Sequence, residues 1–277
     1  MISKVGFVVN PTIPAARAVA EEVTKILHAA RVLTVECSNI MAPDVWARHD
    51  GLDMIFAFGG DGTILRSARV AAPLQVPILG INLGRVGFLS EMGPDAVREL
   101  IPQVLAGKYW VERRSMLRAE LWRDGHRIHA FDALNDVVAS RAALSRVVDC
   151  RLMVNGEKMT TFVADGVILA TPTGSTAYAM AAGGPIIHPE VRGILVTPIA
   201  PYLTIIRSLI LPEDSQIELD ITTDDAAFLT VDGQNHVPLE DGDAVRITTS
   251  PVPALFARLQ PRPYFAATLT QRLQRKD

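Results

Sequence analysis

Short hydrophobic runs alternate with helically spaced hydrophobic positions along the first hundred or so residues. Val5–Val9 is an apolar run, and Ala15–Ala30 places apolar side chains three or four residues apart, as on one face of a helix. Further strand-like runs are Val32–Cys37, Ile55–Phe58 and Ile78–Ile81. Strands alternating with helices are typical of a parallel, doubly wound sheet, which binds ligands at the carboxyl ends of its strands. We therefore predict such a domain, with a site in the turns after Phe58 and Ile81.

The pattern changes after about Arg113, where apolar and polar residues begin to alternate. Arg151–Val154 and Lys158–Val163 flank Asn155-Gly156, a strong signal for a β-hairpin. Other strand-like runs are Leu117–Trp122, Ile194–Pro198, Gln216–Thr222, Ala226–Val231 and Ala244–Thr249. The one good helix candidate is Ser175–Ala182. This half is predicted to be a β-rich, sandwich-like domain.

The segment around Pro251 and Pro253 is typical of a connector between domains. After it, we expect Tyr264–Leu269 to return to the first domain as an added strand. The predicted organisation is an α/β domain over 1–112, completed by 252–277, and a β-rich domain over 113–251.

Composition excludes several classes of protein. The 277 residues are 49% hydrophobic and 21% charged, with a formal net charge of −3, whereas a general nucleic-acid binder carries a basic excess. No apolar stretch reaches the roughly 18–20 residues of a membrane span. The chain enters a strand pattern directly rather than a signal region, so we expect a cytoplasmic protein. Cys37 and Cys150 show no metal-ligand spacing, and we expect reduced, structural thiols and no protein-bound metal centre.

A glycine-rich turn, Gly-Gly-Asp-Gly-Thr at 59–63, follows the apolar run Ile55–Phe58. The next segment, Ile64–Ala72, is predicted to be a helix that ends before Pro73. Asp61 or Thr63 could simply cap this helix. Alternatively, the turn binds phosphate at the helix N-terminus, and Asp61 faces a reacting hydroxyl or a magnesium ion. The turn lacks both the Lys of a P-loop and the spacing of a dinucleotide fingerprint.

Three other segments carry candidate chemistry. Gly80–Leu89, which includes Asn82, is a second glycine-spaced turn after a strand. We expect it to line the other side of the ligand site that the first turn forms. Asn135-Asp136 lies in the strand-like run Ala133–Ser140, where a buried polar pair is costly without partners. The pair is either a solvent-facing bulge or part of a nucleoside pocket. The pocket is chemically reasonable because an Asn amide suits an adenine edge and a carboxylate accepts hydrogen bonds from ribose hydroxyls. The hydroxyl-rich run Thr171–Tyr178 either caps a short helix or binds a polar ligand. No nucleophile elbow surrounds its serine, which argues against a hydrolase.

Taken together, these motifs resemble those of the NAD kinase family. The matching segments, in chain order, are Asn10-Pro11, Gly59–Thr63, Gly80–Leu89, Asn135-Asp136, Asp165-Gly166, Thr171–Tyr178, Ala182–Ile186, Pro198–Pro201 and Val231–Gln234. Gly-Gly-Asp-Gly-Thr is shared with diacylglycerol-type lipid kinases, whereas Thr-Pro-Thr-Gly-Ser-Thr-Ala-Tyr is specific.

The resemblance implies transfer of the ATP γ-phosphoryl group to the 2′-hydroxyl of the adenosine ribose of NAD, giving NADP. Asp61 would accept the proton or orient the hydroxyl, with Mg²⁺ or another divalent cation carried in on ATP. The implied phosphate- and ATP-binding residues are Gly59, Gly60, Gly62, Thr63 and Asn82. The implied NAD-binding residues are Asp61, Gly62, Arg66, Phe88, Asn135, Asp136, Arg146, Asp165, Thr173, Thr176, Ala177, Tyr178, Ala181, Ala200 and Gln234. Most of the implied NAD-binding residues lie in the second domain, so the domain over 1–112 is predicted to bind ATP and phosphate and the domain over 113–251 to bind NAD.

Two departures from the family pattern leave questions open. Many relatives carry Glu where this chain has Asp136, which reaches one methylene less far. Many bacterial relatives specific for NAD have Arg where this chain has Val163, so the preference between NAD and NADH stays open. The choice between ATP and polyphosphate as donor is also open. The family forms homodimers and homotetramers, and we expect the same here. The rival interpretations are a lipid kinase and a dinucleotide-binding regulator without activity.

Overall fold

A computed structural model of the chain describes residues 2–36, 51–84, 87–142, 146–202 and 206–273. The chain divides into two compact units, Met1–Arg113 with Pro253–Asp277 and Arg114–Val252.

The first unit is built on a mainly parallel sheet. Its strands are β1 (Lys4–Val9), β2 (Leu33–Glu36), β3 (Met54–Phe58), β4 (Ile78–Ile81), β5 (Trp110–Arg114) and β18 (Ala254–Arg258). The described strands lie in the order β2-β1-β3-β4-β18-β5, and the pairings from β2 through to β18 are parallel. The strand order therefore reverses between β1 and β3, which makes their carboxyl ends the topological switch point where open α/β sheets bind ligands.

Helices cover both faces of this sheet. The helical segments are α1 (Pro14–Ala29), α3 (Asp61–Leu74), the short 3₁₀ turn η1 (Pro94–Ala96), α4 (Val97–Leu105) and α6 (Tyr264–Leu273). Buried residues of α1 and α4 share one hydrophobic core with Leu79 and Ile81 of β4. Gly80, which faces the other way, lies against α3, since a Cβ added there would approach Ile64 to 2.6 Å. The predicted doubly wound arrangement is confirmed.

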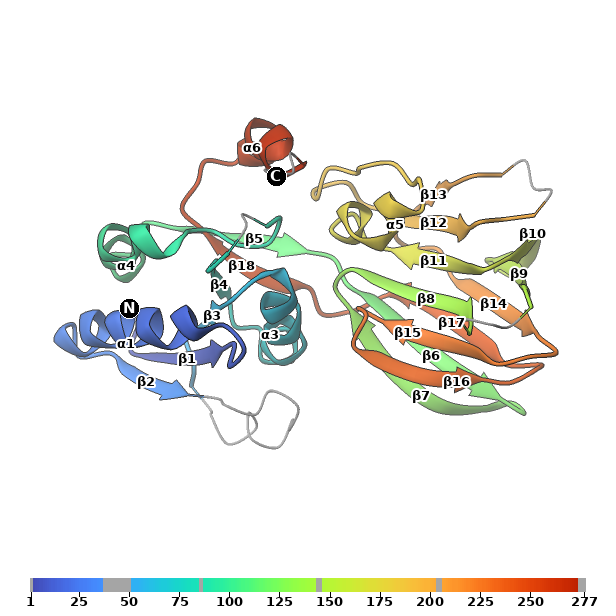
Figure 1. Cartoon of the computed structure of the whole chain (residues 1–277), viewed down its shortest axis with the longest axis horizontal. Coiled ribbons are helices and arrows are strands. Elements are labelled where there is room, and N and C mark those ends of the chain that lie inside the picture. The colour runs from blue at the N-terminus through green and yellow to red at the C-terminus, as the bar shows by residue number, and fades with distance from the viewer. Residues whose placement is uncertain (1, 37–50, 85–86, 143–145, 203–205, 274–277) are drawn as a thin grey trace. The chain divides into compact units, whose positions relative to one another are not determined.

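The second unit is a sandwich of two antiparallel sheets (Figure 1). One sheet has the order β10-β9-β14-β17-β6-β7, with β6 (Leu117–Arg123), β7 (His126–Ala133), β9 (Val148–Val154), β10 (Glu157–Ala164), β14 (Ile217–Thr222) and β17 (Ala244–Thr249). The other has the order β13-β12-β11-β8-β15-β16, with β8 (Asp136–Arg141), β11 (Gly166–Ala170), β12 (Ile194–Ile199), β13 (Leu209–Leu211), β15 (Ala227–Val231) and β16 (Asn235–Leu239). Buried residues of both sheets form one core, which includes Leu152 and Leu169. This confirms the predicted β-rich domain.

The outer face of the second sheet is covered by a short helical segment, η2 (Gly174–Thr176) followed by α5 (Tyr178–Ala181). Ala179 packs there against Ile168 of β11 and Leu195 of β12. The helix predicted over Ser175–Ala182 is present but divided, because the backbone at Ala177, with φ −101° and ψ −126°, leaves the helical region between η2 and α5.

Three further predictions need correction. The helix after the glycine-rich turn begins at Asp61 and runs through Pro73 to Leu74, where Gln75 ends it in a left-handed conformation. The predicted returning strand, Tyr264–Leu269, is the first part of helix α6, and β18 just before it is the strand that joins the sheet. The run predicted as one strand, Ala133–Ser140, is broken at 134–135 between β7 and β8.

Candidate functional site

The glycine-rich turn lies at the switch point of the first sheet. The main-chain N–H of Asn10, directly after β1, donates to the carbonyl of Phe58 at the end of β3, at 3.0 Å. The Asn10 Nδ2 donates to Oγ1 of Thr63, at 3.1 Å, and Thr63 is buried. These two contacts fix the beginning of α3 to the end of β1. The turn is therefore held where a doubly wound sheet binds its ligand.

The three glycines of the turn have different surroundings. A Cβ added to Gly59 would lie 2.3 Å from Oγ1 of Thr63, so Gly59 is required for packing. A Cβ on Gly60 or Gly62 would meet no atom within 4 Å. The backbone is thus open at 60 and 62. The helix that follows has no side-chain hydrogen bond capping its N-terminus, and the Thr63 N–H donates to the Gly60 carbonyl at 2.9 Å. The groups that the turn offers to an anion are therefore the N–H groups of Asp61 and Gly62, together with the helix dipole.

The Asp61 side chain is held by the second turn. Its Oδ2 accepts the main-chain N–H of Phe88 at 2.8 Å, and its Oδ1 accepts that of Leu89 at 3.3 Å. The carboxylate therefore turns away from its own helix, and Asp61 does not cap α3. Thr63 does not cap it either, since its hydroxyl accepts from Asn10. The alternative that these residues are helix caps was wrong.

The remaining candidates of the first unit lie beside this turn. Arg66, one turn along α3, donates from Nη2 to Thr63 Oγ1 at 3.4 Å. Asn82 is buried after β4, and its Oδ1 accepts the main-chain N–H of Gly84 at 3.1 Å. The Phe88 ring, half-buried, packs against Phe265 of α6 with ring centroids 6.5 Å apart. The structure thus brings the two glycine-spaced turns together through Asp61.

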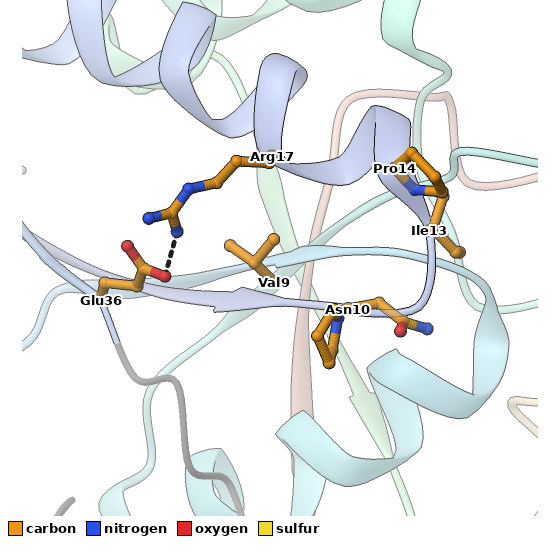
Figure 2. A pocket seen from close by; sticks show the side chains of 7 residues that line it. Val9, Asn10, Ile13, Pro14, Arg17 and Glu36 are labelled. Atoms are coloured by element: carbon orange, nitrogen blue, oxygen red, sulfur yellow. Dashed lines mark hydrogen bonds and ion pairs between the residues drawn. The ribbon is translucent and has the colours of Figure 1, made fainter.

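A hollow of about 290 Å³ opens at the ends of β1 and β2 (Figure 2). Val9, Asn10 and Pro11 line it where β1 ends, and Ile13 and Pro14 line it where α1 begins. Arg17 reaches across to Glu36 in an ion pair, as the dashed line in Figure 2 marks. Because Asn10 also contacts Thr63, this hollow adjoins the glycine-rich turn.

In the second unit, Asn135 and Asp136 lie at the break between β7 and β8. The Asp232 carboxylate accepts the main-chain N–H groups of residues 134–136 at 2.8 to 3.2 Å, which fixes the break. Asp136 is 5% exposed, so the alternative of a solvent-facing bulge was wrong for this residue. Burial, and secondarily the Asp232 charge, raise the pKa of Asp136 to about 7. Its carboxyl makes no hydrogen bond to the residues that the structure describes.

The hydroxyl-rich segment packs directly on this break. Thr171 donates from its hydroxyl to the Leu134 carbonyl at 2.5 Å, and its main-chain N–H donates to the Asn135 carbonyl at 2.9 Å. A Cβ on Gly174 would lie 2.0 Å from the Asn135 carbonyl oxygen, so the two backbones are in close contact. The segment and the Asn-Asp pair therefore form one structure.

The hydroxyls of this segment are used mainly to hold it together. Ser175 is fully buried, donates to the Pro172 carbonyl at 2.6 Å and accepts the Ile187 N–H at 2.9 Å. Thr173 accepts from Arg114 at 3.1 Å, and Thr176 donates to the Thr173 carbonyl at 3.1 Å. Tyr178 is 47% exposed and Ala177 is half-buried. The burial of Ser175 agrees with its not being a hydrolase nucleophile.

Asp165 has an unexpected partner. Its carboxylate accepts a bidentate pair from Arg141, with Nε to Oδ1 at 2.6 Å and Nη2 to Oδ2 at 3.2 Å. This pairing, foremost the hydrogen bonding, raises the pKa of the Arg141 guanidinium. Ala200 follows β12 at the same end of the sheet, with a φ of 44° that is strained for alanine.

The candidates of the second unit thus form two groups. Asp136 pairs across the ladder with Ala170 at one end of β11, and Asp165 precedes the other end. Five residues of strand separate the two ends by about 16 Å. Gln234 belongs to the first end, in the turn after β15, where its buried Oε1 has no hydrogen-bond partner among the described residues. Arg146 and Ala181 are exposed.

Three site residues were not predicted as candidates. Asn10 and Gly87 lie in motifs that the sequence displays, but only the structure shows their contacts, with Thr63 and with Asp61. Arg141 has no signal in the sequence, because its partner Asp165 is 24 residues away, directly before the neighbouring strand β11. Burial raises the pKa of the Cys150 thiol to about 12, as expected of a structural cysteine, and Cys37 lies outside the described residues.

Two negative observations apply to the described part of the chain. No group of three or more His, Cys, Asp or Glu there could hold a metal ion. Among the same residues, no helix has both the length and the apolar character needed to cross a bilayer.

Comparison with known proteins places these features in a family. Residues 46–109 match the family described as ATP-NAD kinase N-terminal domain, and residues 134–259 match ATP-NAD kinase C-terminal domain. An NAD kinase of Chloroflexus aurantiacus is 44% identical over 223 residues, covering 80% of this chain and 81% of the relative.

Solved structures agree with this match. A yeast NADH kinase solved with NADH superposes with a TM-score of 0.84 at 27% identity, covering 99% of this chain and 89% of that one. An Archaeoglobus fulgidus NAD kinase solved with ATP gives a TM-score of 0.75 at 27% identity, covering 98% of each chain. With the predicted motifs in their places on this fold, the chain belongs to the NAD kinase family and is a kinase.

Proposed function

We propose that this kinase transfers the γ-phosphoryl group of ATP to the 2′-hydroxyl of the adenosine ribose of NAD, giving NADP. The observation that carries the proposal is the position of Asp61. Its carboxylate is at the N-terminus of an uncapped helix, at the switch point of a parallel sheet, with its side chain oriented by two main-chain N–H groups. A carboxylate in a phosphate-binding turn is suited to a reaction between a phosphoryl group and a hydroxyl.

The turn would hold the phosphates through its backbone. Gly60 and Gly62 leave open space above the chain, so phosphate oxygens can approach the N–H groups closely. Gly59 and Thr63 give the turn its shape, and Asn82 braces the second turn. Mg²⁺ or another divalent cation would enter on ATP, keep several water ligands and neutralise charge on the transferred group.

Asp61 would act on the acceptor hydroxyl. A ribose hydroxyl is a weak nucleophile, and most of the rate in phosphoryl transfer comes from positioning and charge neutralisation. The carboxylate would therefore orient the hydroxyl in line with the phosphoryl group and accept its proton. Arg66, beside the turn, would pair with the pyrophosphate of NAD.

The adenosine half of NAD would be bound at the Asn135-Asp136 end of the second unit. The Asn135 amide suits an adenine edge, and the Asp136 carboxyl, which has no hydrogen bond among the described residues, suits ribose hydroxyls. The orphaned Oε1 of Gln234 at the same end would accept a hydrogen bond from the ligand. Other residues proposed to line the dinucleotide site are Phe88, Arg146, Asp165, Thr173, Thr176, Ala177, Tyr178, Ala181 and Ala200.

The proposal also covers the phosphoryl donor and acceptor, the oligomeric state and the cellular location. We propose ATP as donor, with polyphosphate as the alternative, and NAD as acceptor, with NADH as the alternative. We also propose a cytoplasmic homodimer or homotetramer, which light scattering of the purified protein measures directly.

One experiment tests the central chemistry. NADP formation by the full chain is measured with ATP and Mg²⁺ for the wild type, for Asp61→Asn and for the control Asp95→Asn, an exposed aspartate in the first turn of η1. We expect Asp61→Asn to lower turnover by about a thousandfold while NAD still binds, and Asp95→Asn to leave turnover unchanged.

Near-normal turnover in Asp61→Asn would overturn the role of Asp61. Phosphorylation of NAD lacking the adenosine 2′-hydroxyl would overturn the acceptor position. Parallel assays with polyphosphate, NADH and diacylglycerol decide the alternatives.

A further inference from the structure

The Phe88–Leu89 segment, which holds the Asp61 carboxylate, is itself held by two arginine side chains. Phe88 and Leu89 direct their N–H groups to the Asp61 carboxylate. Their carbonyl groups accept from two guanidinium groups, with Arg272 Nη1 to Phe88 O and Arg258 Nη1 to Leu89 O, both at 2.9 Å. These arginines come from the C-terminal segment, in α6 and β18, about 170 to 184 residues away along the chain.

One peptide group links Asp61 directly to Arg272. The Phe88 carbonyl and the Leu89 N–H belong to the same planar peptide unit. Its oxygen accepts from Arg272 while its N–H donates to Asp61 Oδ1. A hydrogen bond at one end of a peptide group strengthens the hydrogen bond at the other. The next carbonyl, that of Leu89, is fixed by Arg258.

Arg258 is held in place by a buried charge network. Its side chain is 1% exposed and contacts two carboxylates, Glu112 at 2.8 Å and Glu91 at 3.2 Å. The Tyr264 hydroxyl donates to Glu112 at 3.1 Å. The second oxygen of Glu91 accepts the main-chain N–H groups of residues 259 and 260, both at 2.8 Å.

A buried network of this kind is costly unless its geometry is well satisfied. Taking a guanidinium and two carboxylates out of water is unfavourable, and apolar side chains of similar size often give equal stability. Stability alone therefore does not explain why Arg258 lies at this position. Its rigid planar fork does explain it, because one side chain can reach two carboxylates and the Leu89 carbonyl in different directions, as lysine cannot.

We propose that Arg258 is a positioning residue for phosphoryl transfer, acting through the Phe88–Leu89 backbone to fix the orientation of the Asp61 carboxylate. Arg272 supports the same segment. The inference rests on the proposed role of Asp61. It assigns the C-terminal segment a part in catalysis that is exerted through the Phe88–Leu89 backbone.

The test compares four full-length proteins: wild type, Arg258→Lys, Arg272→Met and the control Arg262→Met. Arg262 lies between β18 and α6 and stacks on Trp110 at 5.0 Å. We expect Arg258→Lys to lower kcat by about 30-fold and Arg272→Met by about fivefold, with the KM values for NAD and ATP within about threefold of wild type. Arg262→Met should leave kcat within about twofold. Hydrogen exchange should accelerate at the amides of residues 88 and 89 in the first two variants only.

A kcat within about twofold of wild type in both Arg258→Lys and Arg272→Met would overturn the inference. So would a loss of kcat with unchanged exchange at residues 88 and 89. If Arg258→Lys does not fold, Arg272→Met decides, because the Arg272 side chain is half-exposed whereas that of Arg258 is fully buried. Asp61→Asn, assayed in parallel, separates the two proposals. Retained turnover in Asp61→Asn overturns the role of Asp61. Lost turnover there with full kcat in the arginine variants overturns only the positioning role.

Discussion

Gly87 and the Asp61 carboxylate are in direct contact. A Cβ atom added to Gly87 would lie 2.0 Å from Oδ1 and 2.4 Å from Cγ of Asp61, far inside any permitted separation. The absence of a side chain at position 87 therefore allows the carboxylate to reach the N–H groups of Phe88 and Leu89.

Gly87→Ala should displace the Asp61 carboxylate while the fold stays intact. The atoms in the way are the end of a flexible side chain rather than backbone, so the carboxylate can move at small cost to stability. We expect turnover to fall at least about tenfold, with a melting temperature close to wild type. Gly84→Ala is the matched control, because a Cβ at Gly84 meets nothing within 4 Å. Full turnover in Gly87→Ala would show that this contact does not position Asp61.

Alanine substitutions should separate the three glycines of the turn. Gly59→Ala places its methyl group against Thr63 and Asn10, and we expect it to lower the free energy of unfolding by about 2 kcal/mol. Gly60→Ala and Gly62→Ala should leave that free energy within about 0.5 kcal/mol and raise the KM for ATP, because the methyl groups enter the space proposed for phosphate. Chemical denaturation and steady-state kinetics measure the two effects. Equal destabilisation by all three variants would contradict the division.

Local patterns predicted the parts of the fold that depend on near neighbours in sequence. The strand-turn-helix around Asp61 was evident because an apolar run ends in glycines that only a tight turn requires. The hairpin at Asn155-Gly156 was evident for the same reason, and both residues have a positive φ. The helix after the turn passes through Pro73, against the local preference, because Ala68, Ala71 and Ala72 are buried on it.

Contacts between distant residues could not be predicted from the same patterns. The strand Ala254–Arg258 ends in an arginine, which looks exposed in sequence but is buried between Glu91 and Glu112. The pairing of Asp165 with Arg141 likewise depends on two neighbouring strands. In the candidate site, the residue types and their order could be predicted from the sequence. The main-chain groups of Phe88 and Leu89 that hold the Asp61 carboxylate could not, because they lie 27 and 28 residues away along the chain.

Ser175→Ala tests whether this hydroxyl is structural. Ser175 is fully buried and bonds both to the Pro172 carbonyl and to the Ile187 N–H, so alanine leaves both without that partner. We expect the free energy of unfolding to fall by about 1–3 kcal/mol. Turnover at a temperature where the variant is fully folded should stay within about threefold of wild type. Thr160→Ala, at a half-buried position on β10, is the control. A loss of turnover without loss of stability would assign Ser175 a chemical role.

The buried carboxyl of Asp136 should make stability depend on pH. Its pKa in the folded protein is about 7, above its ordinary value of 3.8, so the folded state binds more protons than the unfolded state between these values. Stability contributed by the protonated carboxyl is therefore lost as pH rises through this window, by an amount on the order of 4 kcal/mol above pH 7.

Asp136→Asn keeps the shape of the side chain and removes its charge. It should therefore raise the melting temperature at pH 8 by about 5 °C or more and have little effect on the melting temperature at pH 5. Asp149→Asn, on β9 of the same unit, is the control and should leave the pH dependence unchanged. Calorimetry of the three proteins without ligand measures these melting temperatures. Equal melting temperatures of wild type and Asp136→Asn at pH 8 would contradict a raised pKa of the Asp136 carboxyl.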